Sequence, residues 1–414
     1  MTSPGRKKVS IRAQQADFFQ HNLKYFRWSR LFSALYFLVP VWVAIEKRYL
    51  TFSQITILEM LIAGSQLILE LPTGALADLW GRKNTIALGY LISLLAHLVF
   101  AIASTFPHFL IMSLLFGLST SLISGSEDAL IYDTLKQADR ENIFSKLTNQ
   151  MQILFNWGIA GATLIGGLVY QFDFRLPAIL NGLAHLIAGV MVFTMIEPAI
   201  DSEKFTFKNY IKQTKEGFKE LFKNKAAKDF SLFYILVGGF SWPMVIALKN
   251  FTLTELGYSE MLMGIILPIM SLLVVYLLHL LISQQVFKNL KFTFFFLPMV
   301  LIVGYVLGSV YNFYLMPLAI MLVMFVSSAR WNILGKLTNQ LYNSRNRATA
   351  ISTLNMVIGL IYVVVMGVLT VLGWSFDNAL QILFAMLAVS SIMVLLPTAN
   401  RLSQAYQEAH AILD

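Results

Sequence analysis

The stretch Gly74-Ala-Leu-Ala-Asp78-Leu-Trp-Gly81-Arg82-Lys83-Asn-Thr-Ile86 decides the fold of this chain. It lies between two long apolar segments, so we expect a short charged turn between two membrane helices. Its glycines allow a tight turn and the close approach of a neighbouring helix. Asp78 can pair with a cation or cap a helix, and Arg82 can bind a carboxylate or helix-end carbonyl groups in a fork. The stretch therefore has the chemistry of a latch that forms and breaks.

The composition excludes a soluble globular protein. Hydrophobic residues make up 57% of the 414 residues and charged residues only 13%, whereas soluble domains are about 45–50% apolar and about 25% charged. The mean hydropathy is +0.67. The chain has no cysteine, which excludes disulfides, thiolate metal sites and cysteine nucleophiles. Residues 1–20 are basic and polar, so no cleavable signal peptide is expected there.

Twelve apolar segments have about the 20 residues that a helix needs to cross a bilayer. They are residues 26–45, 52–77, 85–103, 109–135, 143–170, 176–196, 230–253, 262–286, 292–310, 315–341, 348–374 and 379–397. We therefore predict an all-α membrane protein with twelve spans in two six-helix bundles. The predicted parts are a cytoplasmic segment 1–21, a bundle 22–197, a linker 198–229, a bundle 230–400 and a tail 401–414. The linker is basic and amphipathic, which predicts a helix at the cytoplasmic membrane surface.

The lysines and arginines orient these spans. With both termini on one side of the membrane, that side carries 25 of the 31 basic residues, and the other side carries only Lys47, Arg48 and Arg175. Basic loops stay in the cytoplasm, so both termini are predicted to be cytoplasmic. The net charge of +9 therefore reflects membrane topology, and no nucleic-acid partner is expected.

The spacing of Gly74, Asp78, Gly81, Arg82 and Lys83 resembles the loop signature of the major facilitator superfamily, Gly-x-x-x-Asp-x-x-Gly-Arg-Lys/Arg, between spans two and three. One departure is Leu79, where many members carry arginine. The corresponding turn of the second half, residues 284–291, has neither the aspartate nor the glycines.

This resemblance implies two bundles built of inverted repeats, with a central cavity lined by spans one, four, seven and ten. It also implies alternating access, in which Asp78 and Arg82, together with Asp133, close the cytoplasmic side. The protein is expected to be a monomer in a bacterial inner membrane, resembling drug-efflux members, with a small-molecule substrate and the bilayer as its partners.

Span four carries two adjacent carboxylates, Glu127 and Asp128. Charged groups in a span are costly and mark functional sites. Neighbours on a helix are about 100° apart, so one is expected to face the cavity and the other a neighbouring span. Repulsion and desolvation would keep one protonated, as a proton carrier requires. The structural alternative is an ion pair of Glu127 with Arg30 or Arg330.

Further candidates for the substrate cavity are polar or aromatic residues of spans one, seven and ten. They are Arg30, Tyr36, Trp242, Lys249, Arg330, Trp331 and Asn332. Arg330 could hold an anionic substrate or neutralise Glu127. Arg30 and Lys249 lie near the ends of their spans and could instead extend to the membrane surface.

Two other features have competing interpretations. The small residues of span five, Gly158 to Gly167, resemble the antiporter signature of the superfamily weakly, and close helix packing explains them equally well. His97 and His185 lie in spans expected on the periphery and His279 lies in span eight, and lone histidines are more often packing residues than proton relays. The sequence has no phosphate-binding loop, metal-ligand spacing or nucleophile motif, so no enzyme, metal site or organic cofactor is expected, and transport would draw on an ion gradient, most plausibly of protons.

The first functional hypothesis is proton-coupled export of small amphipathic or drug-like compounds. The alternatives are uptake or facilitated transport of an anionic metabolite, favoured by Arg30, Lys249 and Arg330, and an uncoupled lipid-translocating or receptor-like protein.

Overall fold

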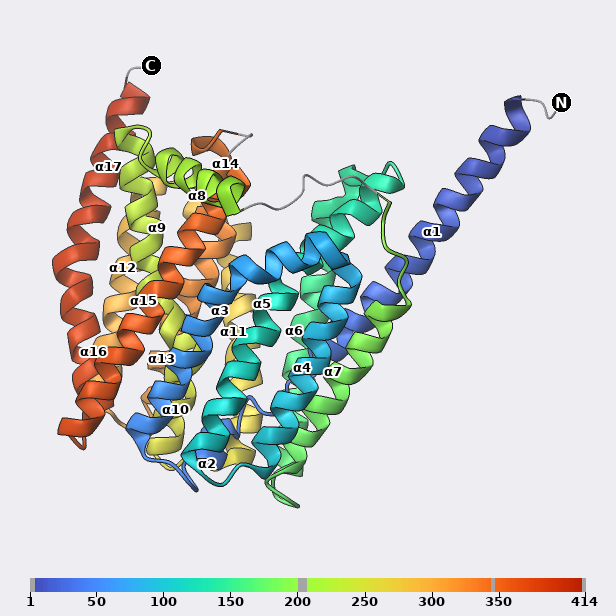
Figure 1. Ribbon diagram of the computed structural model, residues 1–414. Coiled ribbons are helices and arrows are strands. Elements are labelled where there is room, and N and C mark those ends of the chain that lie inside the picture. The colour runs from blue at the N-terminus through green and yellow to red at the C-terminus, as the bar shows by residue number, and fades with distance from the viewer. Residues whose placement is uncertain (1–3, 200–206, 344–346, 412–414) are drawn as a thin grey trace. The chain divides into compact units, whose positions relative to one another are not determined.

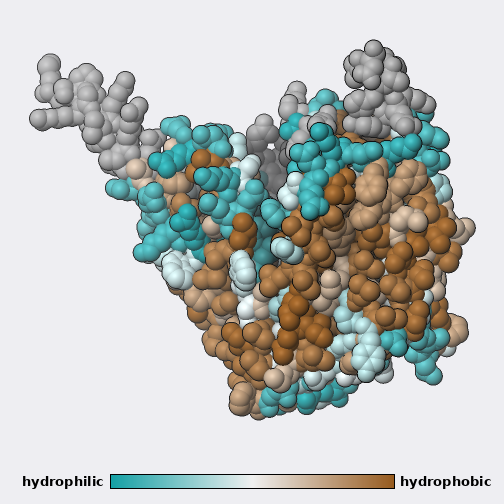
Figure 2. Space-filling view, turned by 180° about the vertical axis from the view of Figure 1, so that it is seen from behind, coloured by the Kyte–Doolittle hydropathy of each residue, from teal (hydrophilic) through white to brown (hydrophobic). Residues whose placement is uncertain are grey.

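The structure is a computed structural model that describes residues 4–199, 207–343 and 347–411. These described residues form helices joined by short turns, without a strand (Figure 1). Eleven segments among them are long and apolar enough to cross a membrane. Apolar side chains cover the middle of the helices and polar ones gather near their ends (Figure 2). The predicted all-helical membrane fold is confirmed.

The chain divides into two compact units, which we describe separately. The N-terminal unit contains residues 1–42 and 64–207. Its helices are α1 (Pro4–Ser33), the later part of α3 (Phe52–Trp80), α4 (Arg82–Ile102), α5 (Phe106–Gln137), the short η1 (Glu141–Ile143), α6 (Phe144–Val169) and α7 (Leu176–Thr194). Helix α4 packs against both α5 and α7.

The C-terminal unit contains residues 43–63 and 208–414. Its helices are α2 (Trp42–Glu46), the start of α3, α8 (Phe207–Leu221), α9 (Lys225–Pro243), η2 (Met244–Leu248), α10 (Lys249–Glu255), α11 (Glu260–Ser283), η3 (Val286–Lys288), α12 (Leu290–Val310), α13 (Met316–Ala329), η4 (Arg330–Leu334), α14 (Gly335–Leu341), α15 (Arg347–Ser375), α16 (Ala379–Ser390), η5 (Ser391–Leu395) and α17 (Leu396–Ala411). Three of its spans contain a π-helical turn, at η2, η4 and η5. Such turns often occur at functional sites.

Span one is broken, so the prediction of one continuous helix over 26–45 is wrong. Helix α1 ends at Ser33, residues 34–41 form turns, and α2 follows. Pro40 lies in this segment and cannot donate a backbone hydrogen bond. The backbone N–H of Leu38 donates to Oδ1 of the buried Asn181 at 3.1 Å. Irregular backbone is tolerated at membrane depth where other protein groups satisfy it in this way.

Two glycines of α6 make room for the broken segment. A Cβ atom at Gly158 would lie 2.6 Å from Cβ of Ala34, and one at Gly166 would overlap the carbonyl oxygen of Phe37. Gly161 has open space around its Cα. Close packing therefore explains two of the span-five glycines.

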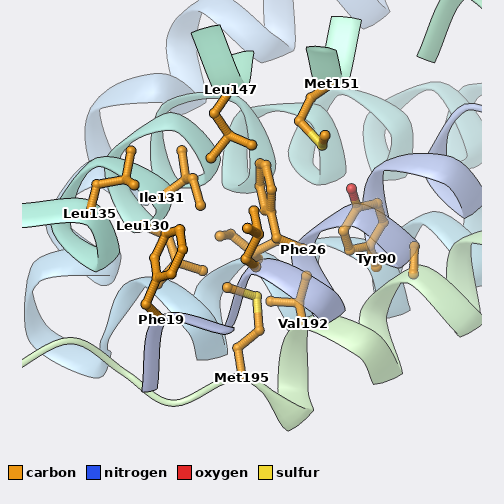
Figure 3. Packing of buried hydrophobic residues seen from close by; sticks show 13 residues of the cluster. Phe19, Phe26, Tyr90, Leu130, Ile131, Leu135, Leu147, Met151, Val192 and Met195 are labelled. Carbon is orange, nitrogen blue, oxygen red and sulfur yellow. The ribbon is translucent and has the colours of Figure 1, made fainter. Parts of the chain in front are cut away.

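A cluster of buried side chains from α1, α4, α5, α6 and α7 forms part of the core of the N-terminal unit (Figure 3). Phe19 and Phe26 of α1 pack there against Leu130 and Ile131 of α5. Tyr90 of α4 lies at the edge of the cluster (Figure 3). This packing fixes α4 and α5 side by side, and so places Tyr90 close to the carboxylate of Glu127.

Part of the predicted linker 198–229 lies outside the described residues, at 200–206. Its remainder contains α8, which packs on the C-terminal unit. Gly217 lies against Thr353 of α15 without space for a Cβ. The Glu220 carboxylate accepts a hydrogen bond from the backbone N–H of Asn343 at 2.8 Å. Contact of α8 with the membrane surface, like the predicted domain boundaries, stays a prediction.

Candidate functional site

The turn between α3 and α4 is shaped by Gly81 and Glu197. Gly81 has φ +94°, which side-chain-bearing residues rarely adopt, and it directly precedes α4. The Glu197 carboxylate accepts hydrogen bonds from the backbone N–H groups of Arg82 (2.8 Å) and Lys83 (2.9 Å). It satisfies two free N–H groups at the start of α4 and places negative charge at the positive end of the helix dipole. The Lys83 ammonium lies over the Phe193 ring at 5.2 Å.

Arg82 connects this turn to α5. Its guanidinium forms an ion pair with Asp133 and donates a second hydrogen bond to the carbonyl oxygen of Ala129 at 2.9 Å. The structure thus brings together Arg82 and Asp133, as the family resemblance implies. Gly74 and the half-buried Asp78 lie in the last two turns of α3. The function of these residues as a cytoplasmic gate stays a prediction.

The carboxylate of Glu127 is buried against the last turn of α1. Its Oε2 lies 2.6 Å from Nη1 of Arg30, and its Oε1 lies 3.5 Å from the Tyr90 hydroxyl. Glu127 is only 8% exposed, whereas its neighbour Asp128 is exposed. The Arg30 guanidinium also stacks over the Phe155 ring at 4.7 Å. Of the two partners considered for Glu127, the structure selects Arg30, and Arg30 therefore does not extend to the membrane surface.

His97 and His185, which the sequence presents as lone histidines, lie together in the N-terminal unit. Their assignment as packing residues stays a prediction. Their ring centroids are 5.1 Å apart, and Oγ of Ser93 lies 2.5 Å from Nδ1 of His185. Tyr36, predicted to line the substrate cavity, packs edge-on against His185 with 5.1 Å between ring centroids. The sequence spacing of α4 and α7 alone does not show which of their faces meet, so it could not predict this pair.

The C-terminal unit contains a second buried charge, Arg330, in the π-helical turn η4. Its guanidinium carbon lies 4.5 Å from the ring centroid of Trp331, 4.8 Å from that of Tyr234 and 6.0 Å from that of Trp242. Arg330 is 0% exposed, yet its three guanidinium nitrogens make no hydrogen bond of ordinary geometry with the described residues. Aromatic faces stabilise a cation by about 2 kcal/mol or more in a dry site, and the Tyr234 hydroxyl is an electrostatic partner of the guanidinium, which leaves further N–H donors for another acceptor. The site is therefore suited to a planar group that carries hydrogen-bond acceptors.

Gly238 of α9 permits this arrangement. A Cβ atom there would lie 3.2 Å from Nε of Arg330 and 2.5 Å from Cδ1 of Ile358. Trp331 is 44% exposed, whereas Arg330 beside it is 0% exposed. Asn332 is also exposed, and its side chain donates to the carbonyl oxygen of Ser328 at 2.9 Å.

A third polar cluster, which sequence reasoning missed, joins residues 43–63 to the C-terminal helices. The hydroxyl of Tyr362 donates to Oε2 of Glu59 at 2.5 Å, and Lys47 forms an ion pair with Glu255 at 2.8 Å. Lys249 donates to a carbonyl of its own helix and is an electrostatic neighbour of Glu59. Glu59 lies inside the predicted span 52–77, and a carboxylate in an apolar span was the signal that could have identified it.

Two apolar helical units, each holding charged side chains in its interior, define a polytopic membrane protein of the transporter class. The family model of the Major Facilitator Superfamily matches residues 31–324. The chain belongs to this superfamily, whose members are transporters. Among the described residues, no group of three or more histidine, aspartate or glutamate side chains could hold a metal ion.

Relatives with similar sequences are distant. The chain is 25% identical over 261 residues to the uncharacterized MFS-type transporter YxaM of Bacillus subtilis (strain 168), which covers 60% of this chain and 63% of that protein. It is 25% identical over 189 residues to the quinolone resistance protein NorA of Staphylococcus aureus (strain Mu50 / ATCC 700699), covering 45% of this chain and 47% of NorA. The chain thus aligns with about half to two thirds of the length of these relatives.

Solved structures of two transporters have a similar fold over nearly the whole chain. A mutant form of the nucleoside transporter NupG has a TM-score of 0.69 at 16% identity, covering 92% of this chain and 98% of NupG. The POT family transporter PepTSo has a TM-score of 0.71 at 12% identity, with coverage of 92% and 98%. At these identities the likeness shows the fold alone.

Proposed function

We propose that the protein is a secondary active transporter that uses a proton gradient to export small amphipathic or drug-like compounds by alternating access. The observation that carries this proposal is the buried pair of Arg30 and Glu127, whose charged atoms lie 2.6 Å apart. Buried ion pairs are costly to form, and replacing one with apolar residues is often neutral or stabilising. A pair inside a span is thus better explained by ion coupling than by stability.

Protonation of Glu127 would change what Arg30 can bind. When the carboxylate is ionised, it neutralises the guanidinium; when it takes a proton, the guanidinium keeps its charge and loses its counter-ion. Arg30 then needs another acceptor or water, which makes the protonated state unstable in the same packing. This is how one proton can bias the equilibrium between two conformations.

Alternating access also requires contacts that can break at each end of the helices. The ion pair of Arg82 and Asp133 lies beyond the end of α3, and the pair of Lys47 and Glu255 lies before its start. The Lys47 and Glu255 side chains are 36% and 31% exposed, and exposed pairs contribute only about 0–1 kcal/mol, whereas the Arg82 and Asp133 side chains are 18% and 14% exposed. Such contacts suit gates that open and close during transport.

The similarity to NorA supports the choice of drug-like compounds as substrates, because NorA carries the name of a quinolone resistance protein. The aromatic walls of the Arg330 site fit planar amphipathic molecules. In this proposal the protein works as a monomer in the plasma membrane, with both termini cytoplasmic and no cofactor apart from the coupling ion.

A second candidate function is transport of an anionic metabolite. It is favoured by Arg330, because a carboxylate or phosphate group of a substrate would satisfy the buried donors that the described residues leave without acceptors. Arginine binds such planar groups in a bidentate manner. The two candidates differ in the charge of the ligand that binds.

The test is thermal stabilisation of the purified protein by cationic amphipathic drugs, organic anions, sugars and lysolipids, at acidic and at neutral pH. The export proposal expects cationic amphiphiles to stabilise the protein, and more weakly at acidic pH because protons compete at Glu127. It expects Glu127→Gln to abolish that pH effect and Asp128→Asn, an exposed neighbouring control, to retain it.

Stabilisation by organic anions alone, lost in Arg330→Met, would replace the export proposal with anion transport. Stabilisation by lysolipids with no effect of pH, unchanged in Glu127→Gln, would instead indicate an uncoupled lipid-translocating protein.

A further inference from the structure

Helix α4 carries three polar side chains on one face. Tyr90, Ser93 and His97 follow the spacing i, i+3, i+7, and each is at most 2% exposed. The row extends for about 10 Å along the helix, away from the turn at Gly81 and toward the end of α4 at Ile102. Buried polar groups in an otherwise apolar span are costly and usually functional.

The row starts at the carboxylate of Glu127, because the Tyr90 hydroxyl lies 3.5 Å from its Oε1. The hydroxyl group of Ser33 also lies near the Tyr90 hydroxyl, and the backbone of Ser33 is next to His185. The rings of Tyr90 and His185 meet edge to face, with 5.8 Å between their centroids. Tyr90 and Ser33 thus join the carboxylate to the histidine pair.

The row continues through Ser93 to the second histidine. Its Oγ lies 2.5 Å from Nδ1 of His185 and 3.4 Å from Nδ1 of His97. Nδ1 of His97 also lies 2.7 Å from the carbonyl oxygen of Ser93. A carbonyl oxygen only accepts, so Nδ1 of His97 carries a hydrogen and Nε2 of the neutral ring has a free lone pair.

Nε2 of His97 is buried and makes no hydrogen bond of ordinary geometry with the described residues. Leaving a buried polar atom without a partner costs about 1–3 kcal/mol. A pair that served only to fasten α4 to α7 would gain from apolar side chains instead. The titratable and charged groups around the pair are Arg30 and Tyr36 from span one, Tyr90 on α4 and Glu127 on α5.

We propose that Tyr90, Ser93, His97 and His185 form the proton path that serves Glu127, leading from the carboxylate toward the end of α4 at Ile102. This inference rests on the proposed function of Glu127 as the proton carrier. Imidazole rings and hydroxyl groups suit a relay because each can accept a proton on one side and release another on the opposite side.

Each transfer moves one proton and breaks no other bond. A proton binds Nε2 of His97, and Nδ1 of His97 releases its own proton to Oγ of Ser93. The Ser93 hydroxyl passes its proton to Nδ1 of His185, and Nε2 of His185 releases its own proton to the Tyr90 oxygen. The Tyr90 hydroxyl in turn gives its original proton to Oε1 of Glu127. Rotation of the side chains and return of the tautomers then reset the row.

The test is infrared difference spectroscopy of the purified protein in lipid nanodiscs after a rapid pH jump. The band of the protonated Glu127 carboxyl group is identified by its absence in Glu127→Gln. We expect His185→Asn, which keeps an amide near Ser93 but cannot relay a proton, to slow the response of this band at least tenfold. Tyr90→Phe removes only a hydroxyl group and is also expected to slow the response of the Glu127 band. If His185→Asn does not fold, Tyr90→Phe alone tests the proton path.

His279→Asn is the matched control, because His279 is exposed on α11 in the other unit. It should respond at the wild-type rate. A Glu127 band that responds at the wild-type rate in both Tyr90→Phe and His185→Asn would overturn the proton path and leave the proposed function standing. If the Glu127→Gln spectrum still contains every carboxyl band of the wild-type spectrum, Glu127 is not the proton carrier, and the proposed function is overturned as well.

Discussion

Arg30 and Glu127 are 97 positions apart in the sequence, and their charged atoms lie 2.6 Å apart in the interior of the N-terminal unit. The last turn of α1 places the guanidinium, and span four places the carboxylate. The exposed Asp128, one residue further, belongs to a different face of the same helix. The pair therefore singles out one of two adjacent carboxylates for proton coupling.

Glu127→Ala should destabilise the protein, because it leaves the Arg30 cation with no counter-ion. Removing one partner of a buried pair costs about 3–5 kcal/mol, and since the Arg30 side chain is 19% exposed we expect a loss at the lower end of that range. The double variant with Arg30→Met should recover part of the loss. Equilibrium unfolding in detergent measures the free energy of unfolding of the two single variants and the double variant, and hence the coupling free energy between Arg30 and Glu127. Additive effects of the two substitutions would contradict a direct interaction.

Gly166→Ala should disrupt the packing of α6 on the broken segment of span one, because the added methyl group would overlap the backbone of Phe37. Overpacking of this kind costs about 1–3 kcal/mol. Gly161→Ala, in the same helix with open space around it, should be neutral or stabilising by up to about 1 kcal/mol. Equal stability of the two variants in the same unfolding assay would argue against the packing role of Gly166.

Gly81→Ala should weaken the turn before α4. Its φ of +94° strains any L side chain, and the new methyl group would lie 3.2 Å from the carboxyl carbon of Glu197. Backbone strain of this type costs about 1–3 kcal/mol. Gly64→Ala, in open space within α3, is the control. Thermal unfolding should show a lower Tm for Gly81→Ala only; an unchanged Tm would mean that the turn relaxes without cost.

Arg330→Met should raise stability and abolish the binding of ligands that carry acceptor groups. Keeping a cation in a buried site costs a desolvation free energy that an apolar side chain of similar length does not incur. Gly238→Ala, which forces Arg330 or Ile358 to move, should weaken the same binding, whereas Gly335→Ala has only ordinary contacts. Ligand-induced shifts of Tm measure both effects. Full ligand response in Arg330→Met would remove Arg330 from the site.

The sequence pattern predicts much of this fold because twelve apolar segments and one charged turn leave few alternatives. It fails at span one, where hydropathy continues through residues 34–41 although the backbone does not stay helical. The break depends on Asn181 and on the glycines of α6, which are far away in the sequence. Hydropathy measures burial in lipid and does not detect a helix break that other helices stabilise.

The candidate site, like the fold, could be predicted from the sequence only in part. The charges inside spans, Arg30, Glu127 and Arg330, stand out in the sequence because they are costly in a membrane. Their partners do not, since Tyr90, Tyr234 and the pair of histidines are side chains that are common in any span. Which of them meets a charge depends on the rotation of each helix about its axis, and a single sequence fixes that only through tertiary packing.

The central claim is that proton coupling acts through Glu127. The most direct test is transport of the compound that best stabilises the purified protein, driven by an imposed pH gradient across proteoliposomes. We expect wild type and Asp128→Asn to concentrate the compound and Glu127→Gln to lose at least nine tenths of this gradient-driven transport, while all three still exchange labelled for unlabelled compound at equal pH. Gradient-driven transport by Glu127→Gln at the wild-type rate would contradict the account.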